Sequence, residues 1–126
     1  MTKAQIERIG KRWQRRLLLE HWRVVWVATC EEAMNDEGHL GTCAWDVDTL
    51  SATIHVATGR PAAEVESTML HELLHLVVGG VVCAGRQAAA RLNADAAQIA
   101  YGMIESEAER AVRCLERVIW EQEHRQ

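Results

Sequence analysis

The sequence predicts an α+β fold: an N-terminal helix, a small, mainly antiparallel three-stranded sheet, a motif-bearing helix and a C-terminal helix. Three observations support this prediction. Apolar residues recur at helical spacing near the N-terminus, three short runs rich in valine, threonine and tryptophan follow, and the second half has long apolar stripes of helical period. With 126 residues, of which 48% are hydrophobic and 25% charged, the chain is expected to form one domain over residues 1–126.

The first half of the chain supplies the first helix and the strands. Apolar residues from Ile6 to Leu17 share one side of an amphipathic helix that is expected over residues 2–19. Valine and tryptophan are then concentrated in the run HWRVVWVAT, which is typical of a strand. The runs TCAWDV and SATIHVAT predict two more strands, joined by a tight turn near Asp48.

The chain after residue 58 predicts helices. Pro61 suits a first helical position, and the pair Gly79 and Gly80 is expected to end this helix at Val78. A loop over residues 81–87 should follow, and after it a long helical region leads to the C-terminus.

The final helical region is expected to break near Asn93 or Gly102. Its last part has apolar residues at helical spacing, so one side should be buried. That side consists of Ile104, Ala108, Ala111, Val112, Leu115, Val118 and Ile119.

Charge and hydropathy narrow the function classes. The net charge of −4 gives no global attraction to nucleic acid or anionic lipid. The basic residues within 3–16 are expected to form a solvated helix face, which argues against a nucleic-acid partner. The alternative is a nucleic-acid adaptor in which this basic helix docks on phosphate through Arg12, Arg15 and Arg16. Glu20, His21 and Arg23 interrupt the apolar run LLLEHWRVVWVA, which excludes a signal-peptide core and a membrane span there. A cytoplasmic protein without a membrane partner is therefore expected.

The cysteines and the acidic stretch within residues 31–37 predict no metal site. The four cysteines form no CxxC pair and are expected to be thiols, with a bridge between Cys30 and Cys43 across a hairpin as the alternative. The acidic residues within 31–37 lack the spacing of an EF-hand loop, so no calcium loop is expected there.

The residues His71-Glu72-Leu73-Leu74-His75 fit the pattern HExxH inside a predicted helix. Helical positions i and i+4 lie on one face, about one turn apart, so both imidazoles can bind one zinc ion. Zinc lowers the pKa of bound water toward neutrality, and Glu72 is placed to take its proton and pass it to a leaving amine. The pattern therefore predicts hydrolysis of an amide bond. Two hydrogen-bonded core histidines and a structural zinc site are the alternatives.

A tetrahedral catalytic zinc needs a third protein ligand. The longer pattern HExxHxxGxxH fails here, because Val78 and Val81 stand at its glycine and histidine positions. His124 lies close to the C-terminus. The third ligand is therefore expected to be a carboxylate of the last helix: Glu105, Glu107 or Glu109.

Three further features of the sequence bear on a site. The strand SATIHVA precedes the motif helix and is interpreted as a sheet edge along which an extended peptide can align. Tyr101 is the only tyrosine, and a phenol near zinc can stabilise an oxyanion, although simple packing is the favoured interpretation. For His55, a half-exposed position on a strand is favoured over one in the cleft.

The order of these features resembles minimal zincin metallopeptidases of the gluzincin type, and is especially similar to small HExxH proteins encoded by phages and prophages. The resemblance covers most of the chain beyond His21 and is carried by ATIHVA, HELLHL and ERAVRCLERVI. In those proteins a metal ligand lies three residues before the apolar residue that opens a VxxLExxI-like run. That residue is Val112 here, which points to Glu109. The pattern ExxAD/N of other gluzincins fits loosely from Glu105 and would make Glu105 the ligand instead.

The resemblance implies a zinc-dependent metallopeptidase that acts on a peptide or protein substrate. His71, His75 and Glu109 would bind Zn²⁺, with Glu105 as the alternative third ligand, and Glu72 would be the general base. The rival interpretation is a catalytically silent interaction module that keeps a zinc-binding zincin scaffold. A phage-encoded protein would work in the host cytoplasm. The sequence leaves the substrate, the biological process and the oligomeric state open.

Overall fold

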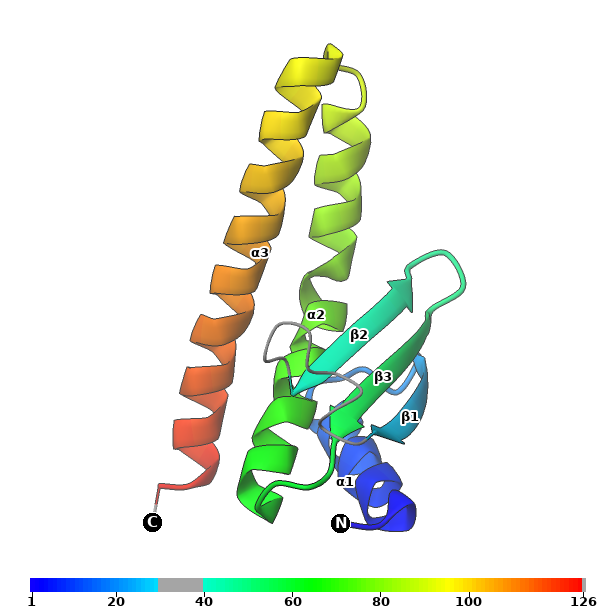
Figure 1. The fold of residues 1–126 in the computed structure, drawn as a ribbon, viewed down its shortest axis with the longest axis vertical. Helices are drawn as coiled ribbons and strands as arrows, with labels where there is room; N and C mark the ends of the chain where they lie inside the picture. Colours follow the sequence, from blue (N-terminus) through cyan, green and yellow to red (C-terminus); the bar gives the residue numbers. More distant parts are fainter. Residues whose placement is uncertain (30–39, 126) are drawn as a thin grey trace. The chain divides into compact units, whose positions relative to one another are not determined.

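The computed structural model describes residues 1–29 and 40–125, and these form three helices and one three-stranded sheet (Figure 1). This confirms the α+β class and the predicted order of elements. The elements are α1 (Lys3–Arg16), β1 (Arg23–Thr29), β2 (Gly41–Asp46), β3 (Ser51–Ala57), α2 (Ala62–Ala89) and α3 (Ala94–Glu123). The chain divides within α2 into two compact units, residues 1–73 and 74–126. Because α2 runs through both units, the single domain expected over residues 1–126 stays a prediction.

Helix α1 has a defined start and a defined end. A capping box joins Thr2 and Gln5: the Gln5 backbone N–H donates to Thr2 Oγ1, and the Thr2 backbone N–H donates to Gln5 Oε1. The helix ends at Arg16, three residues before the expected boundary. The side chain of Gln14 is buried beneath this end, where its Nε2 donates to the carbonyl oxygens of Leu19 and Trp22 at 3.2 and 3.1 Å. These bonds fix the connection that leads into β1.

The sheet has the strand order β1-β3-β2, and it is mixed (Figure 1). β2 pairs with β3 in the expected antiparallel hairpin, with Asp46 opposite Ser51, whereas β1 pairs with β3 in parallel. The expectation that SATIHVA forms a sheet edge is wrong, because this strand is β3 and is hydrogen-bonded on both sides. Valine-rich runs predict strands, but their composition does not encode which neighbour each strand takes or in which direction. Within residues 1–29 and 40–125 the edge strands are therefore β1 and β2.

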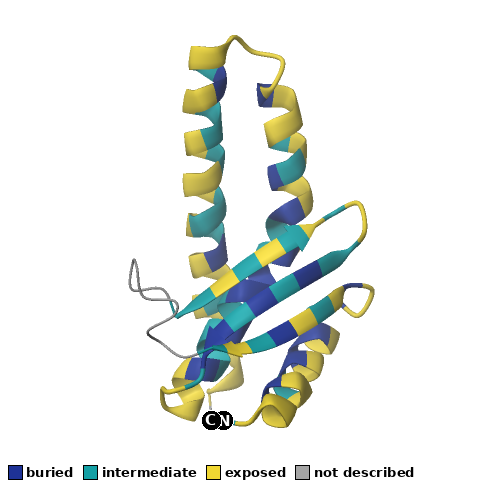
Figure 2. Cartoon of the chain, turned by 45° about the vertical axis from the view of Figure 1, so that its right-hand side comes forward, coloured by how far each residue is buried: buried dark blue, intermediate teal, exposed yellow. Residues whose placement is uncertain are grey.

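One face of the sheet belongs to the core of residues 1–73. Along β3 the side chains of Ala52, Ile54 and Val56 are buried, and the residues between them are half-buried, as the alternating colours in Figure 2 show. α1 packs against β1 where Gly10 meets the Trp26 indole. The same core contains Ile6, Trp13, Val65, Met69, Leu70 and Leu73, all nearly inaccessible to solvent.

Helix α2 continues eleven residues beyond its expected end. Gly79 and Gly80 lie inside the helix, and the loop expected over residues 81–87 is helical, so both expectations are wrong. A glycine inside a helix costs only about 1 kcal/mol relative to alanine. Burial of Leu76 and Val82 on either side of the pair opposes this cost. By length and composition alone α2 could cross a membrane, but 44% of its most apolar window is buried within the protein.

Helix α3 begins where the first of the two expected breaks lies. Asn93 is its N-cap, and the Asn93 side-chain oxygen accepts a hydrogen bond from the backbone N–H of Ala96 at 2.9 Å. Gly102 does not interrupt the helix. Of the apolar side expected to be buried, Val112 is fully buried, but Leu115 and Val118 are 38% and 58% exposed. The prediction of a continuous buried face is therefore only partly correct.

Candidate metal centre

The HExxH motif lies in the first half of α2, as predicted. His71 and His75 are half-buried, and Glu72 between them is only 6% exposed. The potential ligand atoms of these three residues all lie within 4.8 Å of one another. Because His71 and His75 are one helical turn apart, the helix alone holds their rings on one side.

Buried leucines hold this stretch of α2 in place. Leu70, Leu73 and Leu74 have at most 1% of their surface exposed. A helix so anchored has little freedom to rotate about its axis, because each rotation would expose apolar surface at about 25 cal/mol per Å². The directions of the two histidines and of Glu72 are thereby set by the apolar residues that alternate with them.

The donor set fits zinc better than it fits magnesium or calcium. The imidazoles of His71 and His75, together with one carboxylate of α3, are ligands typical of zinc, whereas magnesium and calcium take oxygen ligands almost exclusively. Ligand atoms about 2.0–2.1 Å from one tetrahedral zinc lie about 3.3 Å from each other. Nε2 of His75 and Oε2 of Glu109 are 3.3 Å apart, a distance that fits two ligands of one ion as well as a direct ion pair.

Among the three candidate glutamates of α3, Glu109 is the one whose carboxylate contacts the motif. Its second oxygen lies 3.4 Å from Nε of Arg113. Glu105 is 62% exposed and its carboxylate is paired with Arg86 at 2.7 Å, and Glu107 is paired with Arg110 at 3.3 Å. These contacts favour Glu109 as the third ligand, and the assignment itself stays a prediction.

Strand β2 lies beside Glu72, which sequence reasoning missed. A Cβ atom added to Gly41 would lie 3.0 Å from Cγ of Glu72 and 2.6 Å from Cγ2 of Thr68. The backbone of the edge strand therefore passes directly over the general base that we predict. A glycine opening an otherwise ordinary strand is the available signal, since such a residue often marks a close backbone approach.

Cys43, two residues along β2 from Gly41, belongs to the same surroundings. Burial, and secondarily the negative charge of Glu72, raises the pKa of the Cys43 thiol from 9.0 to about 12. This thiol therefore stays protonated throughout the physiological range. The alternative of a Cys30–Cys43 bridge lies outside the described residues, as does the acidic stretch within 31–37, because residues 30–39 are not described.

The other two candidate residues lie elsewhere. Nδ1 of His55 is 3.3 Å from Oγ1 of Thr29, and His55 alternates with the buried Ile54 and Val56 along β3, so it belongs to the more exposed face of the sheet. Tyr101 lines a shallow hollow with Arg86 and Glu105, about two helical turns before Glu109 in α3.

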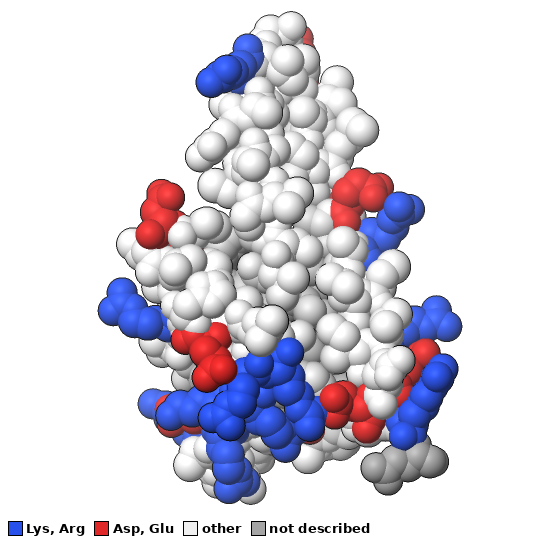
Figure 3. All heavy atoms as spheres, turned by 180° about the vertical axis from the view of Figure 1, so that it is seen from behind, with Lys and Arg blue, Asp and Glu red and all other residues white. Residues whose placement is uncertain are grey.

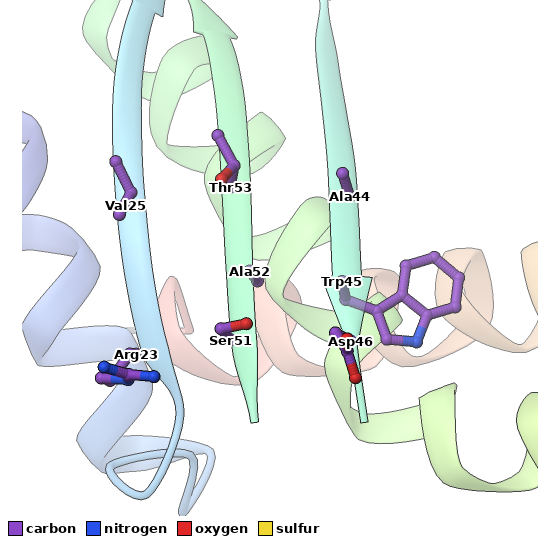
Figure 4. Close-up of a pocket in the computed structure, with 8 residues that line it drawn as sticks. All are labelled: Arg23, Val25, Ala44, Trp45, Asp46, Ser51, Ala52 and Thr53. Carbon is purple, nitrogen blue, oxygen red and sulfur yellow. The ribbon is translucent and has the colours of Figure 1, made fainter. Parts of the chain in front are cut away.

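A second shallow hollow, of about 420 Å³, occupies the more exposed face of the sheet (Figure 4). Val25, Thr53 and Ala44 form its floor across the three strands, and Arg23 and Asp46 flank Ser51 at one end. Its lining includes none of the predicted metal ligands.

Comparisons of the chain with known protein families, with curated proteins and with solved structures found no match. The case for a metal centre therefore depends on the residues described above, and the resemblance to zincins depends on the motif and on the order of the elements.

Proposed function

We propose that this chain is a zinc-dependent peptidase in which His71, His75 and Glu109 hold the metal and Glu72 is the general base. The observation that carries the proposal is the His71-Glu72-His75 cluster, with its ligand atoms within 4.8 Å of one another and with Glu109 3.3 Å from His75.

Each residue has one task in the proposed reaction. Zinc, when bound, supplies a Lewis acid that makes water acidic and polarises the carbonyl of the scissile bond. The Glu72 carboxylate accepts a proton from the attacking water and delivers it to the nitrogen of the leaving amine. Its burial keeps competing water away, because Glu72 is 6% exposed.

The edge strand supports a peptide as the substrate. Among the strands that the structure describes, β2 pairs with β3 alone, and its first residue Gly41 lies against Glu72. An extended peptide can add to such an edge through main-chain hydrogen bonds, which would bring a peptide bond toward the base. In this proposal β2 aligns the substrate, in place of the expected β3.

Metal content tests the ligand assignment. Purified protein dialysed against micromolar zinc should hold one zinc per chain by mass spectrometry of the metal. His71→Ala and Glu109→Gln should each lower this content and weaken the affinity. His55→Ala and Glu105→Gln are the matched controls, since His55 lies on the sheet and Glu105 is paired with Arg86. Retention of zinc by a double His71→Ala/His75→Ala variant would overturn the site.

Hydrolysis tests the role of Glu72. Glu72→Gln keeps the shape of the side chain but cannot accept the proton, so it should keep zinc and lose at least about 100-fold in kcat/KM on an unstructured protein such as casein. Parental turnover by this variant would contradict the general base. One zinc per chain with no hydrolysis by the parental protein would favour the silent interaction module instead.

A further inference from the structure

Basic side chains cover the exposed side of α1, where they form the dense group of Lys and Arg atoms in the lower part of Figure 3. With Ala4 and Glu7 they line a hollow of about 650 Å³. The residues that α1 buries, Ile6, Gly10 and Trp13, lie on its other side. We call the following exposed residues the basic face: Arg8, Lys11, Arg12, Arg15 and Arg16.

The charge of the chain is divided unevenly. Residues 1–16 hold six basic residues against one acidic residue, a net charge of +5, whereas residues 17–126 hold eight against seventeen, a net charge of −9. A protein that is acidic as a whole repels polyanions, so a polyanion can approach it favourably only at such a local basic surface. The overall charge of −4 hides this division.

Three residues of the basic face contact other side chains of the protein. Arg12 is paired with Glu66, and the guanidinium of Arg16 lies 5.5 Å from the centre of the Trp13 ring. Arg8 and Lys11 have no ion pair with any of the residues that the structure describes. Arg15 lies 4.0 Å from Glu20, and because both side chains are largely exposed this pair contributes little.

We propose that the basic face binds the phosphate backbone of nucleic acid without reading its sequence. Arg8, Lys11 and Arg15 occupy about 10 Å along the helix, which matches the rise of about three phosphates on one strand of a duplex. Arginine, which predominates on this face, binds phosphate through two parallel hydrogen bonds. A lipid surface suits the face less well, because α1 buries its apolar side and has none to insert.

The salt dependence of binding to a 20-base-pair duplex DNA of mixed sequence tests this proposal. Three phosphate contacts predict a slope of about −2.7 for log K against log salt, so Kd should rise about 40-fold between 50 and 200 mM salt. In Arg8→Gln/Lys11→Gln one contact remains. The slope for this variant should be about −0.9, and its Kd should rise only about 3.5-fold between 50 and 200 mM salt.

A matched control removes two cations elsewhere. Arg91→Gln/Arg110→Gln changes the net charge by the same amount. Arg91 lies in the turn before α3 and Arg110 lies in α3, so this variant should keep the parental slope. Circular dichroism should show all variants folded, since the substituted side chains are exposed. The proposal would be overturned by the absence of binding at 50 mM salt, by an unchanged slope in Arg8→Gln/Lys11→Gln, or by binding to phosphatidylserine vesicles but not to DNA. None of these outcomes depends on zinc or on hydrolysis.

Discussion

A methyl group added at Gly41 should damage the proposed catalytic site without touching a metal ligand. The new Cβ atom of Gly41→Ala would lie 2.6 Å from Cγ2 of Thr68, 3.0 Å from Cγ of Glu72 and 3.2 Å from Oε1 of Glu72, whereas ordinary contact begins at 3.4 Å. Thr68 must therefore give way by about 0.8 Å and Cγ of Glu72 by about 0.4 Å, unless β2 itself moves.

The magnitude follows from these overlaps. Overpacking of this size costs about 1–3 kcal/mol of stability. A catalytic group misplaced by 1 Å can lose about 100-fold in rate, so a shift of 0.4 to 1 Å in Glu72 should lower kcat/KM about 6- to 100-fold. None of the three atoms nearest to the new Cβ belongs to His71 or His75, so the zinc content should stay at the parental value.

Three measurements on one preparation separate these effects: urea unfolding, zinc content and casein hydrolysis. Gly59→Ala is the control, because a Cβ added there meets nothing within 4 Å and should change none of the three. If Gly41→Ala unfolds at the parental urea concentration and hydrolyses casein at the parental rate, the close approach of β2 to Glu72 is wrong. The stability result stands even if the parental protein proves to be a silent module.

Three further predictions concern stability. The Cys43 thiol holds its proton in the folded chain to about pH 12 but releases it from about pH 9.0 when unfolded. Folding stability should therefore be fully present below pH 9 and fall above it by up to about 1.4 kcal/mol per pH unit. Cys43→Ala should remove this part of the pH dependence in urea titrations at pH 8–10, and Cys114→Ala, at an exposed position, should not. Gly10→Ala would place a Cβ 2.7 Å from Cζ2 of Trp26 and should lower the free energy of unfolding by about 1–3 kcal/mol. A blue or red shift of tryptophan fluorescence should accompany this loss as the indole moves. Unchanged stability would contradict the packing of Gly10 against Trp26. Asn93→Ala should cost about 1 kcal/mol through loss of the α3 cap, and hydrogen exchange should show the loss at the first turn of α3.

The class of the fold and the order of the elements could be predicted because local patterns determine them. The strand run SATIHVA, with its alternating buried and half-buried residues, and the helix cap at Asn93 are properties of a few neighbouring residues. The end of α2 could not be placed in this way. Gly79 and Gly80 are a local stop signal, and only the burial of residues such as Leu76 and Val82, which depends on tertiary structure, outweighs it.

The candidate site also has features that local patterns predict and features that depend on tertiary structure. The spacing of His71, Glu72 and His75 is local, and the structure places their ligand atoms together as the motif predicts. The choice between Glu105 and Glu109 depends on how α3 packs, and one helical turn separates the two residues. The structure brings only Glu109 to His75. The approach of Gly41 is equally non-local, since strand pairing fixes which residue of β2 faces Glu72.

The turn between β2 and β3 has a consequence for how this protein can tolerate insertions and deletions. Oδ1 of Asp46 accepts hydrogen bonds from the backbone N–H groups of Asp48 and Thr49, and Leu50 has a φ of 51°, so this short turn is specified in detail. One residue gained or lost here that shifts the pairing would turn every side chain of β2 to the opposite face of the sheet. A residue with a side chain would then replace Gly41 over Glu72. Length changes in this surface turn should therefore alter the surroundings of Glu72.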